Sequence, residues 1–173
     1  MPRLVYPFSM KRLITYLCLT ISLAFGSFGV GWSGDFQKGL DAAQSGDYTT
    51  ALKEWTSLAE QGDAKAQFNL GIMYERGQGV LQDYKTAVKW YILSAEQGYA
   101  KAQYNLGVMY ALGQGVIADK VYAHMWGNIL NSNGHKDGKK IMDYLLKQGM
   151  TPSQVEKAQD LARECIKKNY KGC

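Results

Sequence analysis

The chain has 173 residues, of which 46% are hydrophobic and 20% charged. These proportions are typical of one folded domain and exclude a disordered chain or a multi-span membrane protein. The net charge is +5. Three of the 20 basic residues (Arg3, Lys11 and Arg12) precede the first acidic residue. Residues 34–173 therefore contain 17 basic and all 15 acidic residues. That near balance argues against nucleic acid as a partner. Three Cys and two His are too few for a multi-ligand zinc site, and the composition implies no cofactor.

Residues 1–33 are predicted to be a signal peptide. Lys11 and Arg12 precede an uncharged apolar run at residues 13–25, which small residues follow. We expect cleavage before Gly34, with Met10 as an alternative start. The competing interpretation is an uncleaved membrane anchor, although the run reaches the roughly 20 residues of a span only by including glycines and serines. We therefore expect a periplasmic or secreted protein, which contacts a membrane only if this segment is retained.

A first helical pair is predicted at residues 34–63. Its helices span residues 35–45 and 48–61 and are joined at Gly46-Asp47. The spacing of Ala42, Ala51, Trp55 and Ala59 is typical of a plain tetratricopeptide pair.

Residues 64–99 and 100–135 are two copies of one 36-residue unit. The string AKAQFNLG at 64–71 recurs as AKAQYNLG at 100–107, and GQGV at 77–80 recurs at 113–116. The apolar spacing predicts two helices per unit, at about 64–76 and 84–97 in the first copy. Gly71 and Gly107 lie mid-helix, where glycine costs roughly 1 kcal/mol, so we expect a neighbouring helix to approach closely there. The other structural positions are the loop glycines and the N-cap aspartates of the second helices: Gly77, Gly79, Gly113, Gly115, Asp83 and Asp119.

Residues 136–173 are predicted to cap the array. Residues 136–147 occupy the place of a further first helix, and a last helix runs from Pro152 to about Asn169. Thr151, Pro152 and Gln154 together give the pattern of a helix start. In an exported protein, Cys165 and Cys173 are expected to form a disulfide, with two free thiols as the alternative. The tail is basic, and Lys167, Lys168 and Lys171 would complement the dipole of the last helix.

Residues 64–98 resemble the Sel-1-like repeat, a relative of the tetratricopeptide repeat with a longer loop that carries the Gly-x-Gly-Val element. Residues 100–134 resemble a second copy in which Asn-Ser-Asn at 131–133 replaces Ala-Glu-Gln at 95–97. The resemblance implies an all-α fold, an α/α solenoid that serves as a protein-interaction scaffold, and it implies no reaction. A cysteine-rich branch of the family places cysteines inside each repeat, and these repeats have none, so an activity of that branch is not transferred.

The candidate binding surface is a polar stripe on the first helices. It comprises Lys65, Asn69, Arg76, Lys101 and Asn105, which stacked repeats would present side by side along a concave groove. The asparagine amides could hold a peptide backbone and the lysines would favour an acidic partner. The alternative is that Asn69 and Asn105 brace the loops after Gly77 and Gly113.

No catalytic motif and no metal set is evident, so we predict a non-enzymatic interaction scaffold of the cell envelope whose partner is a protein or peptide. The alternatives are a cell-wall or β-lactam-related enzyme, by analogy with the cysteine-rich relatives, and a membrane-anchored envelope assembly subunit.

Overall fold

The computed structural model describes residues 34–173, and within that range it consists of eight helices and no strand. The predicted signal peptide, with the alternative start at Met10, lies outside the described residues. The helices are α2 (Phe36–Ser45), α3 (Tyr48–Glu60), α4 (Ala64–Arg76), α5 (Tyr84–Ala95), α6 (Ala100–Leu112), α7 (Lys120–Ser132), α8 (Asp137–Lys147) and α9 (Pro152–Lys167). The predicted all-α fold class is confirmed.

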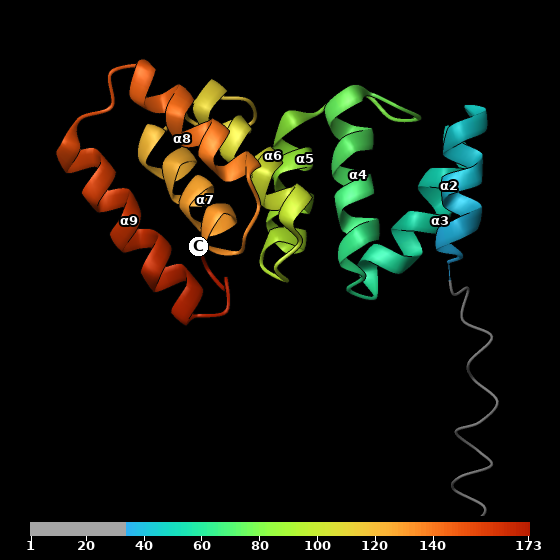
Figure 1. Ribbon diagram of the computed structural model, residues 1–173. Helices are drawn as coiled ribbons and strands as arrows, with labels where there is room; N and C mark the ends of the chain where they lie inside the picture. The colour runs from blue at the N-terminus through green and yellow to red at the C-terminus, as the bar shows by residue number, and fades with distance from the viewer. Residues whose placement is uncertain (1–33) are drawn as a thin grey trace, which may run out of the picture. The chain divides into compact units, whose positions relative to one another are not determined.

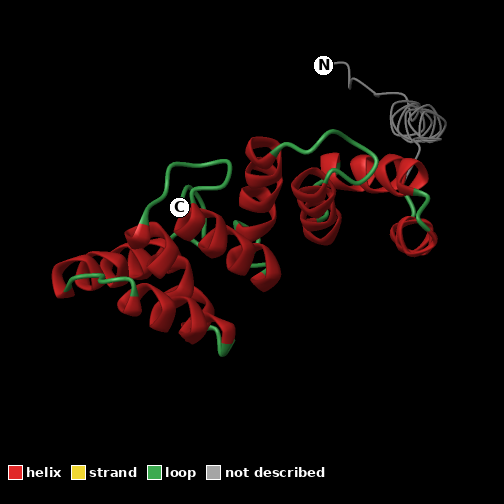
Figure 2. Cartoon of the chain, turned by 90° about the horizontal axis from the view of Figure 1, so that it is seen from above, coloured by secondary structure: helices red, strands yellow, loops and turns green. Residues whose placement is uncertain are grey.

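Each helix packs mainly on its neighbours along the chain, from α2 through α8, and α9 packs on α7. In Figure 1 the helices follow one another in a row, with the α4–α5 and α6–α7 loops at the upper edge. The α5–α6 turn and the α7–α8 turn lie on the lower side of the row, and the described chain ends beside α7. Figure 2 shows the same row from above, built of helices and connecting loops alone.

Two helices end earlier than the sequence pattern predicts. Helix α5 ends at Ala95 instead of residue 97, since the chain turns there toward Gly98, which has a φ of +81°. Helix α9 ends at Lys167 instead of Asn169, because Asn169 and Tyr170 adopt positive φ values of 50° and 65°. The start of α9 has the capping box that Thr151 and Gln154 suggested. Asp83 and Asp119 cap α5 and α7 by accepting from main-chain N–H groups.

A glycine on the first helix of each of two successive pairs gives room for an aromatic ring from the second helix. A Cβ atom on Gly71 would lie 2.4 Å from a ring carbon of Tyr91, and one on Gly39 would lie 2.4 Å from Nε1 of Trp55. Both rings are buried. Because even alanine would collide with the ring, the helix backbones can approach this closely only at glycine.

The Gly-x-Gly loops join the two helices of each repeat and contact the preceding helix pair. Gly77 and Gly113 end α4 and α6 with φ values of +68° and +70°. Two residues on, a Cβ on Gly115 would lie 2.3 Å from the carbonyl oxygen of Tyr84, at the start of α5. The second glycine of the loop thus packs its backbone on the preceding repeat.

The core runs the length of the described chain and is closed by α9, which buries Ala158, Ala162 and Cys165. Cys165 and Cys173 form a disulfide with their Cα atoms 5.5 Å apart, as predicted. Trp90 is only half-buried, whereas Ala87 and Tyr91 on the same helix are fully buried. None of the helices within residues 34–173 is long and apolar enough to cross a membrane.

Replacing Gly115 should be much more costly than replacing Gly134. Both residues have positive φ, but an added Cβ on Gly134 meets nothing within 4 Å. We expect Gly134→Ala to lower the free energy of unfolding by about 1–2 kcal/mol, the cost of a left-handed alanine. Gly115→Ala adds a clash of about 1–3 kcal/mol. Urea denaturation of the two variants measures the difference, and equal losses would contradict the inter-repeat contact.

Stability should fall as the pH drops through the titration range of His124. This side chain is buried, its Nδ1 pairs with the amide of Asn128 at 2.9 Å, and burial lowers its pKa. The unfolded chain therefore takes up a proton near the ordinary value of about 6.5, before the folded chain does. We expect the melting temperature to fall between pH 7 and pH 5, and His124→Gln to flatten that slope. His135→Gln, at an exposed position, should leave the slope unchanged.

Candidate partner-binding site

A cavity of about 670 Å³ opens on the side of the molecule formed by the first helices of the pairs. We call this side, made by α4, α6 and α8, the first-helix face. The cavity is lined by residues of α4, α6, α7, the start of α8 and the turns before α6 and α8: Phe68, Gly98, Tyr99, Ala100, Lys101, Tyr104, Asn105, Leu130, His135 and Asp137. A smaller cavity of about 280 Å³ lies between α6 and α8. Tyr104 lines both and separates them.

The structure brings two of the five predicted binding residues together at the larger cavity. Lys101 and Asn105 line it, whereas Lys65, Asn69 and Arg76 line neither cavity. Lys65 and Arg76 are exposed on α4, and Asn69 is half-buried. The predicted stripe therefore borders a cavity only at its α6 end, and its α4 end lies outside both cavities.

The cavity exists because the second repeat departs from the first. Phe68 is 8% exposed and packs on Tyr91 and Tyr99, with ring centroids 5.7 and 5.2 Å away. Tyr104 occupies the same place one repeat later. Its corresponding neighbours, 36 residues on, are Gly127 and His135. Without the two rings, Tyr104 stays 36% exposed and the space beside it remains open.

Asn105 belongs partly to the scaffold. Tyr91 is fully buried and its hydroxyl donates to Glu75. Burial and this bond raise the pKa of Tyr91, and a hydrogen bond from Asn105 partly opposes the rise. Asn105 thus braces Tyr91 of the preceding repeat. The predicted alternative, in which Asn69 and Asn105 brace the loops after Gly77 and Gly113, stays a prediction. Thirty-six residues earlier, the positions equivalent to Asn105 and Tyr91 are Asn69 and Trp55, and Trp55 has no hydroxyl.

On the first-helix face, two acidic side chains have partners, whereas three basic side chains form no ion pair. Asp137 accepts from the Lys140 ammonium at 2.7 Å, and Glu75 accepts from Tyr91. Lys65, Arg76 and Lys101 form no ion pair with any of residues 34–173. The face therefore carries uncompensated positive charge beside an apolar cavity.

Sequence reasoning missed the aromatic side of this site. In the sequence, Tyr104 belongs to the repeated helix string AKAQYNLG, and Tyr144 on α8 lies outside the repeated strings. Tyr144 is 46% exposed and lines the smaller cavity with Leu112 and Ile141. Tyr104 could have been found by asking which aromatic neighbours of Phe68 the next repeat lacks.

Comparison with known proteins identifies the repeats that form this face. The Sel1 repeat family matches residues 64–99 and 100–135. The chain carries two Sel1 repeats. Sel1-repeat proteins serve in general as protein-interaction scaffolds and not as enzymes. Within residues 34–173, His, Cys, Asp and Glu side chains form no group that could hold a metal ion.

Two solved structures show the same architecture. The chain is similar to a protective antigen present in uropathogenic Escherichia coli strains with an SLR fold, at 30% identity and a TM-score of 0.71, over 76% of this chain and 29% of that one. It is also similar to a Sel1 repeat protein from Oxalobacter formigenes, at 28% identity and a TM-score of 0.62, over 75% of this chain and 55% of that one.

This chain therefore spans less than a third of the length of the first protein and about half of the second. A search among curated proteins found no match. The solenoid prediction is confirmed.

The two repeat-equivalent asparagines should differ in their effect on stability. Asn105→Ala removes an amide that interacts with the buried Tyr91 hydroxyl, so we expect it to lower the free energy of unfolding by up to about 1 kcal/mol. Asn69→Ala has no such bond to lose and should stay within about 0.5 kcal/mol of the parent protein. Chemical denaturation compares the two variants. Equal losses in the free energy of unfolding would show that the interaction of Asn105 with Tyr91 does not stabilise the fold.

Proposed function

We propose that this Sel1-repeat protein is a non-enzymatic scaffold of the cell envelope that binds a peptide segment of another protein on its first-helix face. The observation that carries the proposal is the pair of adjoining cavities separated by Tyr104, with the unpaired Lys101 at the rim. Binding sites of this kind combine an apolar pocket with a few polar groups that fix orientation.

The chemistry of the face favours an acidic segment with an apolar anchor. Phe68, Tyr99 and Tyr104 offer ring surfaces to an aromatic or aliphatic side chain. Lys101 beside the cavity and Lys65 one repeat earlier would attract carboxylates on the flanks of that anchor. The α4 residues Asn69 and Arg76 extend the same surface and would contact the segment beyond the cavity.

The disulfide supports a location outside the cytoplasm. Stable disulfides form in oxidising compartments such as the periplasm, and the Cys165–Cys173 bond agrees with the signal peptide predicted from the sequence. A periplasmic or secreted scaffold would meet its partner there. If the N-terminal segment is retained instead, the same face would be presented from a membrane.

The proposal can be tested with short fluorescent peptides that carry one Phe flanked either by Glu or by Lys. We expect the Glu-flanked peptide to bind the full-length protein, with an affinity that falls as salt is raised. Tyr104→Ala removes the wall shared by both cavities and should weaken binding about tenfold, as the loss of a central aromatic contact does. Lys101→Ala should weaken binding less and reduce its salt dependence.

Lys157→Ala is the matched control, because it removes the same charge from an exposed position on α9, far from the lining residues in sequence. It should leave the affinity unchanged. If the Lys-flanked peptide binds equally well, the charge assignment is wrong. If Tyr104→Ala and Lys157→Ala behave alike, the cavities are not the binding site.

A further inference from the structure

The C-terminal tail, residues 168–173, is folded back and closed by the disulfide. Cys165 lies in the last turn of α9 and Cys173 is the final residue. Between them the chain reverses through Asn169 and Tyr170, both in the left-handed region. Two consecutive non-glycine residues in that region are unfavourable by themselves, so the surrounding contacts must hold them there.

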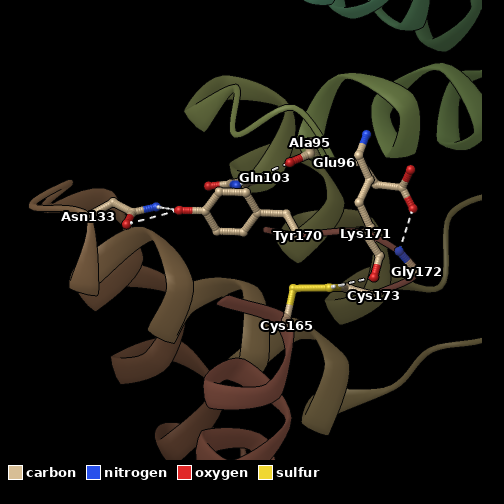
Figure 3. The surroundings of a disulfide bond; sticks show 9 residues. All are labelled: Ala95, Glu96, Gln103, Asn133, Cys165, Tyr170, Lys171, Gly172 and Cys173. Carbon is tan, nitrogen blue, oxygen red and sulfur yellow. Dashed lines mark hydrogen bonds between the residues drawn. A yellow bond between two sulfur atoms is a disulfide. The ribbon is translucent and has the colours of Figure 1, made fainter. Parts of the chain in front are cut away.

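Those contacts reach two turns that are distant in sequence. The amide of Asn133, before α8, donates to the Tyr170 hydroxyl at 3.0 Å, and that hydroxyl also lies 3.3 Å from the Asn133 oxygen. The main-chain N–H of Gly172 donates to the Glu96 carboxylate at 2.8 Å. Figure 3 shows Tyr170 directed toward Asn133, and Gly172 toward Glu96 on the other side of the disulfide.

The same two turns form a wall of the larger cavity. Gly98 lines the cavity, and a Cβ added to it would lie 3.3 Å from the ring of Tyr170. His135, two residues after Asn133, also lines the cavity. The tail therefore supports this wall at both turns, and its ring and Cys173 pack on the same apolar cluster as Tyr99.

We propose that the disulfide-closed tail is a redox-dependent latch, in which Tyr170 holds the α5–α6 turn and the α7–α8 turn at a fixed spacing and so positions the wall of the cavity. With the bond closed, the short loop presents Tyr170 and Gly172 to their partners at little entropic cost. With the bond open, residues 168–173 lose this closure, and ordering them then costs conformational entropy for each residue. The two turns then lose their common support.

The chemistry of opening is thiol–disulfide exchange. A thiolate of a dithiol reductant attacks one sulfur of the Cys165–Cys173 bond and forms a mixed disulfide, while the other cysteine leaves as a thiolate and takes up a proton. The second thiol of the reductant then displaces the remaining cysteine. The cysteines gain two electrons and end as two thiols, and the reductant ends as its own disulfide.

Amide hydrogen exchange on the full-length protein tests the latch without any ligand. After reduction with a dithiol, exchange at residues 96–99 and 133–136 should rise several-fold, whereas α2, α3 and α4 should stay as protected as before. Tyr170→Ala should produce the same rise with the disulfide intact. Lys171→Ala is the matched control, since its exposed side chain makes no hydrogen bond or ion pair with any of residues 34–173.

Two outcomes would overturn the latch. One is unchanged exchange at both turns when thiol titration shows that the bond is open. The other is a uniform rise over α2–α9, which would make the disulfide a general stabiliser. A Cys165→Ser, Cys173→Ser variant should match the reduced protein and no longer respond to the dithiol. Because exchange is read without peptide, failure of peptide binding overturns the proposed function and leaves this result unaffected.

Discussion

The approach of an aromatic ring to a helix glycine is the contact on which the first two helix pairs of the solenoid depend. Trp55 lies on Gly39 and Tyr91 lies on Gly71, with no room for a Cβ atom in either case. The glycine weakens its own helix by about 1 kcal/mol. The ring offsets that cost because it buries a large apolar surface against both helices of the pair.

The candidate site arises where this contact is not repeated. In the second Sel1 repeat, Gly107 faces Ile141, Trp126 and the backbone of α7, and position 127, equivalent to Tyr91, is itself glycine. Gly127 in turn allows Gly138 of α8 to approach the backbone of α7. The helices stay packed without the ring, but Tyr104 loses the aromatic cover that Phe68 has. A regular array would have buried this tyrosine, so the cavity is a consequence of the degraded repeat.

The sequence predicted the elements well and the site poorly, for physical reasons. Helix bounds and caps depend on neighbours within a few residues, so the 36-residue period and the aspartates at 83 and 119 were enough to place α4 to α7. The cavity depends on which side chains are missing one repeat later. Nothing in the sequence around His135 indicates that this residue replaces a ring that packs in the first repeat, that of Tyr99. The tail contacts join residues 76 positions apart, Glu96 and Gly172, which no periodic pattern encodes. The bond from Asn105 to Tyr91 was missed because both residues look like ordinary members of the repeat.

The tail also explains how the array ends. In the first repeat, the Gln97 amide donates to Oε1 of the buried Gln67 at 2.8 Å and so satisfies it. One repeat on, Gln103 is equally buried, but position 133 is asparagine, one methylene shorter, and its amide is bound to Tyr170. Oε1 of Gln103 consequently has no hydrogen-bond partner within residues 34–173. An unpaired buried acceptor costs on the order of 1–3 kcal/mol. The bond from Asn133 to the tail therefore takes the place of a bond between repeats, and it ties the last turn of the array to the disulfide-closed chain end.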